Sequence, residues 1–316
     1  MYYSAAFSAV VLLAACFCFT KLYQRKNGDT AASSVFFNAG CGFFAFLLFG
    51  AFCLISRRTP GSASAFSVAV AAASVVCSGL YLLCGFRIMA EDGLSSYTLF
   101  LMTGGMLVPY LFGMIFLGEY GQSESLIFPA LLPGSLILPA RISGAVLMTA
   151  GVVLAAGPRK GEKKSKRFYP LCAAVFFLNG AVSVLSKVHQ LPENAYRAAD
   201  TISFVVISSL LKALIFIPAF LFLNKKKPVF GEKTSQKLNL VKAVPLVAIC
   251  ALLDAGSYFL QLTGASRLPA SVLYPIVTGG TLVLTAVCGR LFFGERPGRL
   301  KTLGAAVCFV STFFFL

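Results

Sequence analysis

Ten long apolar stretches, separated by short polar segments, dominate the 316-residue sequence and restrict what it can fold into. A bilayer core of ~30 Å is crossed by about 20 apolar residues in a helix. Most stretches have too many long apolar side chains, and too little alternation, for the ~10-residue strands of a membrane barrel. The sequence therefore predicts an all-α membrane protein with ten transmembrane helices, at Tyr2–Thr20, Ala31–Ile55, Ala63–Ala90, Ser96–Leu117, Ile142–Ala156, Tyr169–Val188, Ala198–Leu223, Val241–Ala265, Ala270–Phe293 and Gly298–Leu316.

The composition supports membrane insertion and argues against a soluble enzyme or a disordered chain. Apolar residues make up 58% of the sequence and charged residues 12%, about half of the ~25% that is usual in soluble domains. The net charge of +16 suggests an anionic partner at first, but the basic residues form short runs between the apolar stretches. We therefore interpret the charge as a determinant of membrane topology and expect no nucleic-acid partner.

The number of cysteines raises the question of whether the chain binds a metal ion. The sequence has ten cysteines but no CxxC pair and a single histidine, so a zinc-type ligand set is not available. All ten fall within predicted spans, and we interpret them as small buried apolar residues. We expect no metal and no other cofactor.

A basic linker at 158–168 divides the ten predicted spans into two groups of five, residues 1–157 and 169–316. Because each group has an odd number of spans, the second group has the opposite orientation in the membrane to the first. Inverted repeats are the architecture of secondary transporters, in which the substrate site lies near the membrane midplane between the repeats. The sequence therefore predicts two inverted five-helix repeats around a central site.

Similarity between the two groups supports this division. The end of the fourth span, Gly113–Glu119, resembles the end of the ninth, Gly289–Glu295, and Thr103–Gly105 recurs as Thr278–Gly280. The first group also carries a proline-rich insert at 123–141. Because its prolines interrupt a helix, we expect this insert to lie along the membrane interface or to re-enter the membrane.

These motifs give the chain a resemblance to a known family. In each half an apolar span runs into a Gly-Glu pair, Phe116–Glu119 and Phe293–Glu295, and a Gly-led final helix follows at Gly144 and Gly304. This pattern resembles the ten-helix, EamA-like branch of the drug/metabolite transporter superfamily over essentially the whole chain. The resemblance implies two EamA-like repeats and a transporter. The insert at 123–141 is atypical of that family.

Two indications of membrane orientation conflict. Most of the 27 Lys and Arg residues follow odd-numbered spans, which by the positive-inside rule places those loops in the cytoplasm and both termini outside. Relatives with this architecture usually keep both termini in the cytoplasm. We therefore predict an integral, multi-pass protein of the bacterial plasma membrane and leave its orientation open.

Asp254 is the only acidic residue deep inside a predicted span. A charged side chain at membrane depth costs several kcal/mol unless it is paired, so such residues are functional candidates. Asp254 has two interpretations, a proton-coupling group or counter-ion for a cationic substrate, and a structural ion pair with Lys212. Lys212, halfway along the seventh span, has the same two interpretations.

Other polar residues are candidates for substrate binding in the same cavity. Lys21 and Lys187 close equivalent spans of the two halves, and either extend to the lipid headgroups or bind an anionic group. The remaining candidates either hydrogen-bond or stack on a substrate, or serve as interfacial anchors and helix–helix contacts. They are Tyr81, Thr103, Asn179, Tyr258, Gln261 and Thr278.

The two glutamates of the repeated motif, Glu119 and Glu295, have a structural interpretation. Glu295 precedes the last predicted span and is expected to complement the positive N-terminal end of that helix. The repeated glycines mark either close helix contacts or hinges. They are Gly104, Gly105, Gly279 and Gly280.

The leading functional hypothesis is a secondary transporter, a metabolite or drug exporter or exchanger, that moves a small polar or amphipathic metabolite by alternating access. The sequence has no Walker-type loop and hence no ATPase of its own. We expect a small-molecule substrate, a lipid bilayer, protons as coupling ion, and a monomer or homodimer without enzyme activity. The alternatives are a lipid-linked-sugar flippase and a polytopic membrane transferase, for which His189 and Glu193 would be the nearest acid–base pair.

Overall fold

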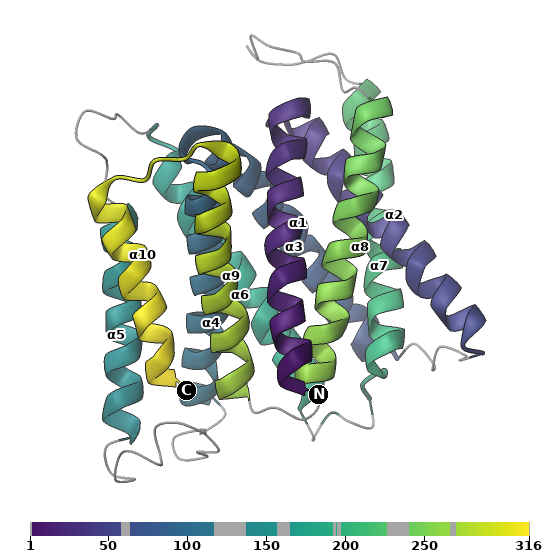
Figure 1. Ribbon diagram of the computed structural model, residues 1–316. Helices are drawn as coiled ribbons and strands as arrows, with labels where there is room; N and C mark the ends of the chain where they lie inside the picture. Colours follow the sequence, from purple (N-terminus) through teal and green to yellow (C-terminus); the bar gives the residue numbers. More distant parts are fainter. Residues whose placement is uncertain are drawn as a thin grey trace.

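The computed structural model describes residues 2–57, 64–116, 137–156, 165–191, 194, 197–225, 240–265 and 270–315. This part of the chain contains ten α-helices and a short C-terminal 3-10 turn (Figure 1). The helices are α1 (Tyr2–Asn27), α2 (Ala31–Ile55), α3 (Ala65–Asp92), α4 (Leu94–Phe116), α5 (Ile137–Ala156), α6 (Phe168–Gln190), α7 (Thr201–Lys225), α8 (Leu240–Ala265), α9 (Ala270–Phe293) and α10 (Arg299–Thr312).

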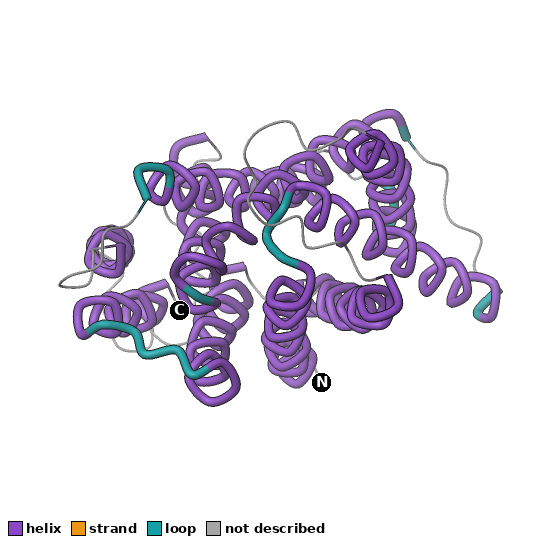
Figure 2. Tube along the Cα trace, turned by 90° about the horizontal axis from the view of Figure 1, so that it is seen from above, coloured by secondary structure: helices purple, strands orange, loops and turns teal. Residues whose placement is uncertain are grey.

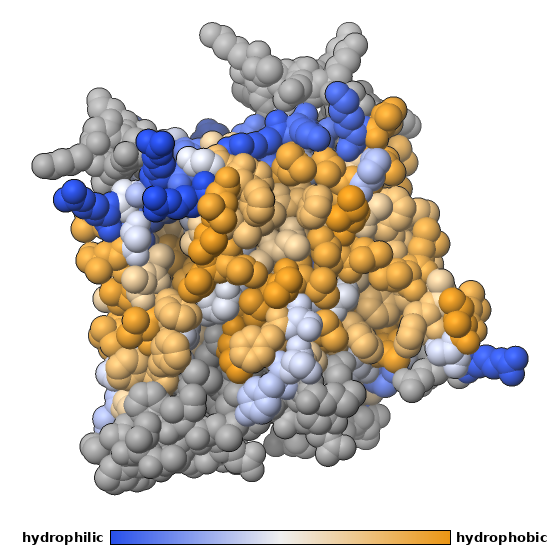
Figure 3. Space-filling view, viewed as in Figure 1, coloured by the Kyte–Doolittle hydropathy of each residue, from blue (hydrophilic) through white to orange (hydrophobic). Residues whose placement is uncertain are grey.

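The predicted all-helical membrane fold is confirmed. In the described part of the chain, eight helices are long and apolar enough to cross a membrane; α5 contributes a shorter apolar segment, Ile142–Ala156, and α10 has 14 residues. Figure 3 shows a broad apolar band across the visible face of the molecule, with hydrophilic residues along the upper edge of this band. Both ends of the described chain lie at the lower end (Figure 1).

The first helix is longer than predicted. We expected it to end at Thr20, but α1 continues to Asn27, so Lys21 lies inside the helix. The helix stops at Gly28, whose φ of 81° suits the residue after a helix end and whose N–H donates to the Gln24 carbonyl at 2.9 Å. Hydropathy detects the membrane-spanning part of this helix and misses its polar last two turns.

The fifth helix also begins earlier than predicted. It starts at Ile137 instead of Ile142, with Pro139 in its first turn, where a missing N–H breaks no helical hydrogen bond. The end of the proline-rich insert is therefore helical. The rest of the insert, including the segment around Pro129 and Pro133, lies outside the described residues.

Helices from opposite sides of the basic linker form the tightest packing in the bundle. The closest pairs are α2 with α7, α1 with α8, α4 with α6, α3 with α6, α5 with α10 and α1 with α9. If each helix is replaced by its counterpart in the other half (α1 by α6, α2 by α7, and so on), the same set of pairs results. The pair α1–α8 then becomes α6–α3, and α4–α6 becomes α9–α1. Figure 2 shows the bundle viewed along its helices. The substrate-binding candidates of both halves therefore lie on helices that contact each other.

Small residues allow the close approach of α5 and α10. A Cβ added to Gly304 would lie 2.5 Å from the Gly151 carbonyl oxygen, and one added to Gly151 would lie 2.8 Å from the Gly304 carbonyl oxygen. Neither position has room for a side chain. Small residues at helix contacts are typical of membrane proteins, where close backbone packing takes the place of the hydrophobic effect.

Candidate functional site

Asp254 lies on α8 and is exposed in the structure. It lies within electrostatic range of Cys41 of α2, Tyr81 of α3 and Tyr97 of α4. The predicted intramembrane acid therefore lies near three helices of the first half.

Lys212 lies on α7 near the same residue of α2. It is half-buried and lies within electrostatic range of Cys41. The helix is held close to α2, because a Cβ on Gly42 would lie 2.9 Å from the Cβ of Lys212. Both Lys212 and Asp254 are described, and no ion pair joins them within 4.0 Å. The structural ion pair that was the alternative interpretation is not formed in this structure.

The two predicted tyrosines have different surroundings. Tyr81 is half-buried beside the main core and within electrostatic reach of Asp254. Tyr258 packs in a separate cluster with Phe49 of α2 and Val205 of α7. Tyr81 thus lies near Asp254 from a neighbouring helix, whereas Tyr258 lies four residues after Asp254 on α8, on the same face of that helix.

Gln261 belongs to the contact between α8 and α1. Its amide Nε2 donates to the Ser257 hydroxyl at 3.0 Å, and that hydroxyl donates to the Ala9 carbonyl at 2.8 Å. Ser257 is fully buried. This chain of hydrogen bonds accounts for Gln261 as a helix–helix contact and leaves its second amide atom for other partners.

Asn179 also connects two halves of the molecule. Its Nδ2 donates to the Leu101 carbonyl of α4 at 2.6 Å, and a Cβ on Gly105 would lie 2.5 Å from that nitrogen. Gly104 contacts the same helix, since its added Cβ would lie 2.1 Å from the Phe176 carbonyl oxygen. The glycine pair of α4 thus lets α6 approach closely.

The two predicted threonines are buried. The Thr103 hydroxyl donates to the Leu99 carbonyl of its own helix at 2.6 Å, and 1% of the residue is exposed. Thr278 of α9 is 7% exposed. Their surroundings agree with the helix-packing interpretation, and their role in substrate binding stays a prediction.

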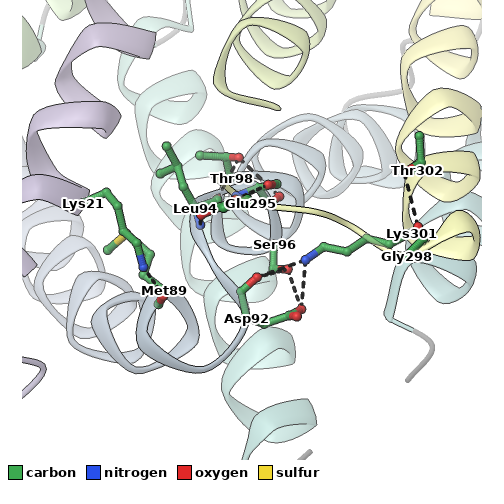
Figure 4. A network of polar contacts seen from close by, with 11 residues as sticks. Lys21, Met89, Asp92, Leu94, Ser96, Thr98, Glu295, Gly298, Lys301 and Thr302 are labelled. Carbon is green, nitrogen blue, oxygen red and sulfur yellow. Dashed lines mark hydrogen bonds and ion pairs between the residues drawn. The ribbon is translucent and has the colours of Figure 1, made fainter. Parts of the chain in front are cut away.

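Lys21 and Lys187 are not equivalent in the structure. Lys21 is 5% exposed, and its ammonium group donates to the Met89 carbonyl near the end of α3 (Figure 4). A cation is favourable there because the last carbonyls of a helix carry partial negative charge. Lys187 of α6 is half-buried. Lys21 therefore neither extends to the headgroups nor lies open to a ligand here.

Glu295 has a structural role, but at a different helix from the predicted one. Its carboxylate accepts the Leu94 N–H at 2.5 Å, the Ser95 N–H at 3.2 Å and the Ser95 hydroxyl. These donors are the first free N–H groups of α4, so Glu295 caps α4 instead of α10. Gly93, with φ 90°, leaves the space for this carboxylate. Glu119 lies outside the described residues.

Two further contacts complete what we call the basic-end network, formed by Lys21, Arg25, Asp92, Glu295 and Lys301. Figure 4 shows Lys21, Asp92, Glu295 and Lys301. The Lys301 ammonium lies 3.1 Å from the Asp92 carboxylate, which also accepts the Ser96 hydroxyl at 2.5 Å. Arg25 donates to the Phe293 carbonyl at 2.9 Å and lies over the Phe293 ring. Sequence reasoning missed this network, although Asp92 and Lys301 both flank predicted spans on the same side.

The opposite end of the bundle contains the single histidine. His189 is 5% exposed, stacks on Phe66 at 5.8 Å and contacts Phe204 at 4.1 Å between ring centroids. Its Nε2 lies 2.9 Å from the Ser67 hydroxyl, which accepts the Ala199 N–H at 2.8 Å. We call this group the terminal-end cluster.

The structure does not support an acid–base or metal centre in the part of the chain that it describes. Glu193, the suggested partner of His189, lies outside that part. Across the described ranges, no group of three His, Cys, Asp or Glu side chains could hold a metal ion. All ten cysteines are free thiols, buried or half-buried in helices.

An apolar groove of about 820 Å³ lies between α4 and α5. Its walls include Leu107 and Tyr110 of α4 and Ile142 and Ala145 of α5. It contains none of the predicted substrate-binding residues. The groove and the Asp254–Lys212 region are therefore separate features.

Comparison with known proteins supports a transporter. Residues 167–316 match the sequence model of the EamA-like transporter family. This EamA-like match covers the second half of the chain, and for that half it confirms the resemblance to the drug/metabolite transporter superfamily. The EamA-like assignment and the apolar helices together indicate a multi-pass membrane transporter.

A solved structure titled "Crystal structure of protein" has the same overall fold. It aligns with a TM-score of 0.53 over 99% of this chain and 95% of its own length, at 15% sequence identity. At that identity the likeness concerns the fold alone. No curated protein matches the sequence.

Proposed function

We propose that the protein is a secondary transporter that moves a small polar or amphipathic metabolite by alternating access of two inverted five-helix repeats. One observation carries this proposal. Asp254 and Lys212, of opposite charge, both lie within electrostatic range of Cys41 of α2 without forming an ion pair with each other. They lie on α8 and α7 of the second half, and both of these helices pack against α2 of the first.

Charge pairing is the physical basis for the substrate class. Two ionised side chains at membrane depth cost several kcal/mol when they have no partner. A substrate with a cationic group at Asp254 and an anionic group at Lys212 supplies both partners at once, and Tyr81 adds an aromatic face beside Asp254. A polar metabolite that carries both charges therefore suits the site better than a neutral one.

The arrangement of helices supports the inverted repeat. Packing pairs recur when each helix number is advanced by five, as a pseudo-two-fold relation between the repeats requires. Five helices in each repeat place its two ends on opposite sides of the membrane. An alternating-access cycle then needs the interleaved contacts of one end to open while those of the other end hold.

Protons are the proposed coupling ion, and Asp254 is their proposed carrier. An accessible intramembrane carboxylate can bind either a proton or a cationic group, and this competition is what couples their movement. Among the described residues, no acid lies within ion-pair distance of Lys212. In this structure Lys212 therefore does not compete with a proton or a cationic substrate group for Asp254.

Transport by the purified protein in liposomes tests the proposal. With a panel of labelled zwitterionic, cationic and anionic metabolites, we expect exchange of a zwitterion. Asp254→Asn should lower substrate accumulation driven by a pH gradient at least tenfold, while some substrate exchange remains. Asp29→Asn, at an exposed acid after α1, is the matched control and should behave as the unmodified protein. Absence of any uptake or exchange across the panel would overturn the proposal.

The apolar groove favours a second candidate, the lipid-linked-sugar flippase. A groove with apolar walls between α4 and α5 suits an acyl or prenyl chain. Scrambling of a fluorescent lipid-linked sugar in the same liposomes distinguishes the two functions. Scrambling that Leu107→Trp blocks, together with no exchange of soluble metabolites, would favour the flippase.

A further inference from the structure

The turn between α9 and α10 lies at the basic end of the bundle, and exposed arginines lie on it and next to it (Figure 1). Arg296 belongs to the connecting residues 294–298, and Arg299 is the first residue of α10. Arg25 of α1 joins them, because its guanidinium donates to the Phe293 carbonyl at 2.9 Å and lies over the Phe293 ring. We call these three arginines the arginine corner.

The acids near the arginine corner are already bonded to other groups. The Glu295 carboxylate accepts the first N–H groups of α4, and the Asp92 carboxylate lies 3.1 Å from the Lys301 ammonium. In the part of the chain that the structure describes, no acid lies within ion-pair distance of Arg25 or Arg299. The arginine corner therefore carries positive charge that an anion from outside the chain can neutralise.

Exposed apolar side chains adjoin the arginine corner. Leu291 and Phe292 of α9 are 71% and 72% exposed, and Leu300 and Leu303 of α10 are each 54% exposed. The first two lie at the end of the candidate membrane span Ile276–Phe293, and the other two lie in the first two turns of α10. A molecule bound here meets cations and an apolar surface together, as a phospholipid does at the edge of a bilayer.

We propose that the arginine corner binds the headgroup phosphate of an anionic phospholipid from the surrounding bilayer, with the acyl chains against the exposed apolar residues of α9 and α10. A guanidinium matches phosphate oxygens with two parallel hydrogen bonds, and basic clusters beside membrane helices bind anionic headgroups. A zwitterionic headgroup also has a phosphate, but it brings a cation that the arginines repel. The corner therefore selects lipids with a net negative charge.

The bound lipid also stabilises the contact between the two halves at this end. Arg25 belongs to the first half, whereas Arg296 and Arg299 belong to the second. Like charges that are gathered at one place repel each other. An anionic headgroup weakens this repulsion, so the basic end is more stable with the lipid than without it.

Tryptophan fluorescence measures lipid binding at the corner, because the chain has no tryptophan of its own. Phe292→Trp places a single reporter next to the corner, and Phe52→Trp, at an exposed residue near the end of α2, places a matched reporter at the opposite end. Each protein is reconstituted in mixed bilayers in which either phosphatidylglycerol or phosphatidylcholine is brominated, since bromine quenches a nearby tryptophan. The two quenching curves give the binding constant of the anionic lipid relative to that of the zwitterionic lipid.

The expected ratio of binding constants differs between the two reporters. At Phe292→Trp we expect a ratio of roughly five or more, because one cation near an anionic surface contributes about that factor. At Phe52→Trp the ratio should be close to one. Raising the salt concentration should lower the ratio at Phe292→Trp, since salt screens the attraction of exposed charges.

Arginine variants in the Phe292→Trp background test the residues of the corner. Arg296→Ala and Arg299→Ala should each lower the ratio, and the double variant should bring it close to one. Arg299→Lys keeps the charge and should retain most of the preference. Arg57→Ala, which removes an exposed arginine after α2 at the opposite end, is the matched control and should leave the ratio unchanged.

The following results would overturn the site. Equal quenching by the two lipids at Phe292→Trp shows that the corner does not select anionic lipid. A ratio that is the same at both reporters, or that survives the double variant, shows that the arginine corner is not the cause of the preference. Soluble glycerol phosphate that abolishes the preference assigns the arginines to a free phosphate instead of a lipid.

Thermal unfolding in detergent tests the stabilisation. Added phosphatidylglycerol should raise the melting temperature of the unmodified protein, and phosphatidylcholine should not. The Arg296→Ala and Arg299→Ala double variant should lose this increase. A melting temperature that phosphatidylglycerol leaves unchanged would contradict the stabilisation, while the quenching ratios would still decide whether the lipid binds. None of these measurements depends on transport.

Discussion

The two ends of the bundle connect the halves with different chemistry. At the basic end, the described contacts between halves are charged: Glu295 caps α4, Lys301 pairs with Asp92, and Arg25 binds the end of α9. At the terminal end, the described contacts include those of the Ser64 and Ser67 hydroxyls and a histidine ring, and these are not ion pairs. The comparison teaches that the two ends of a bundle built from two five-helix halves need not be held together in the same way.

The difference has a physical consequence for alternating access. Charge-assisted hydrogen bonds are roughly twice as strong as neutral ones, but salt weakens them where they are accessible. The Lys301 and Asp92 side chains are 13% and 17% exposed, so this pair is partly shielded. We infer that the basic end is the more firmly closed end in this structure, and the following predictions test that inference in order of expected effect.

The largest effect is expected at the cap of α4. Glu295→Ala removes the acceptor of two backbone N–H groups and one hydroxyl, and should lower the free energy of unfolding by about 2 kcal/mol. Glu295→Gln keeps one acceptor oxygen and should cost less. Thermal unfolding in detergent measures both variants, with Arg290→Ala, at an exposed residue of α9, as control. A Glu295→Ala protein with an unchanged melting temperature would contradict the capping role.

A smaller loss is expected at the terminal end. Ser67→Ala leaves the Ala199 N–H without its acceptor and removes the partner of His189, which should cost roughly 1–2 kcal/mol. Because the hydrogen bonds of Ser67 include no ion pair, the loss should be the same at low and high salt. Ser56→Ala, at an exposed serine that bonds to its own helix, is the matched control. A strong salt dependence in Ser67→Ala would remove the distinction between the two ends.

Much of the helical framework could be predicted because it follows from hydropathy. The bounds of α2 and α9 agree with the predicted spans at both ends, since polar or conformationally special residues directly flank the apolar segments. The end of α1 was wrong by two turns because Lys21 and the residues after it are polar but helical. Hydropathy measures what enters the membrane, and helix ends are decided by capping residues such as Gly28.

The candidate site could be predicted in part. Asp254 and Lys212 stand out because charges at membrane depth are rare and need a reason. The partner of Glu295 could not be predicted, because the neighbouring helix in sequence, α10, is not the helix that its carboxylate reaches. Which helices are adjacent is a property of the interleaved packing, and a local motif carries no information about it.

The smallest effect is expected at the Lys301–Asp92 pair, and it is the sharpest test of the comparison. Lys301→Ala removes an ion pair whose carboxylate keeps a second donor in the Ser96 hydroxyl, so the loss should be about 0.5–1 kcal/mol. This loss should shrink as salt is raised, since screening weakens the pair in the unmodified protein as well. Thermal unfolding of Lys301→Ala and Lys301→Arg over a range of salt concentrations measures it.

Lys301→Arg retains the charge and should recover most of the loss, which separates the ion pair from the packing of the lysine stem. Should Lys301→Ala lose as much stability at high salt as at low salt, the contact would be one of packing. The basic end would then differ from the terminal end by the cap of α4 and the Arg25 contact with the end of α9. Because both are charged contacts between the halves, the asymmetry would then rest on two residues, Glu295 and Arg25.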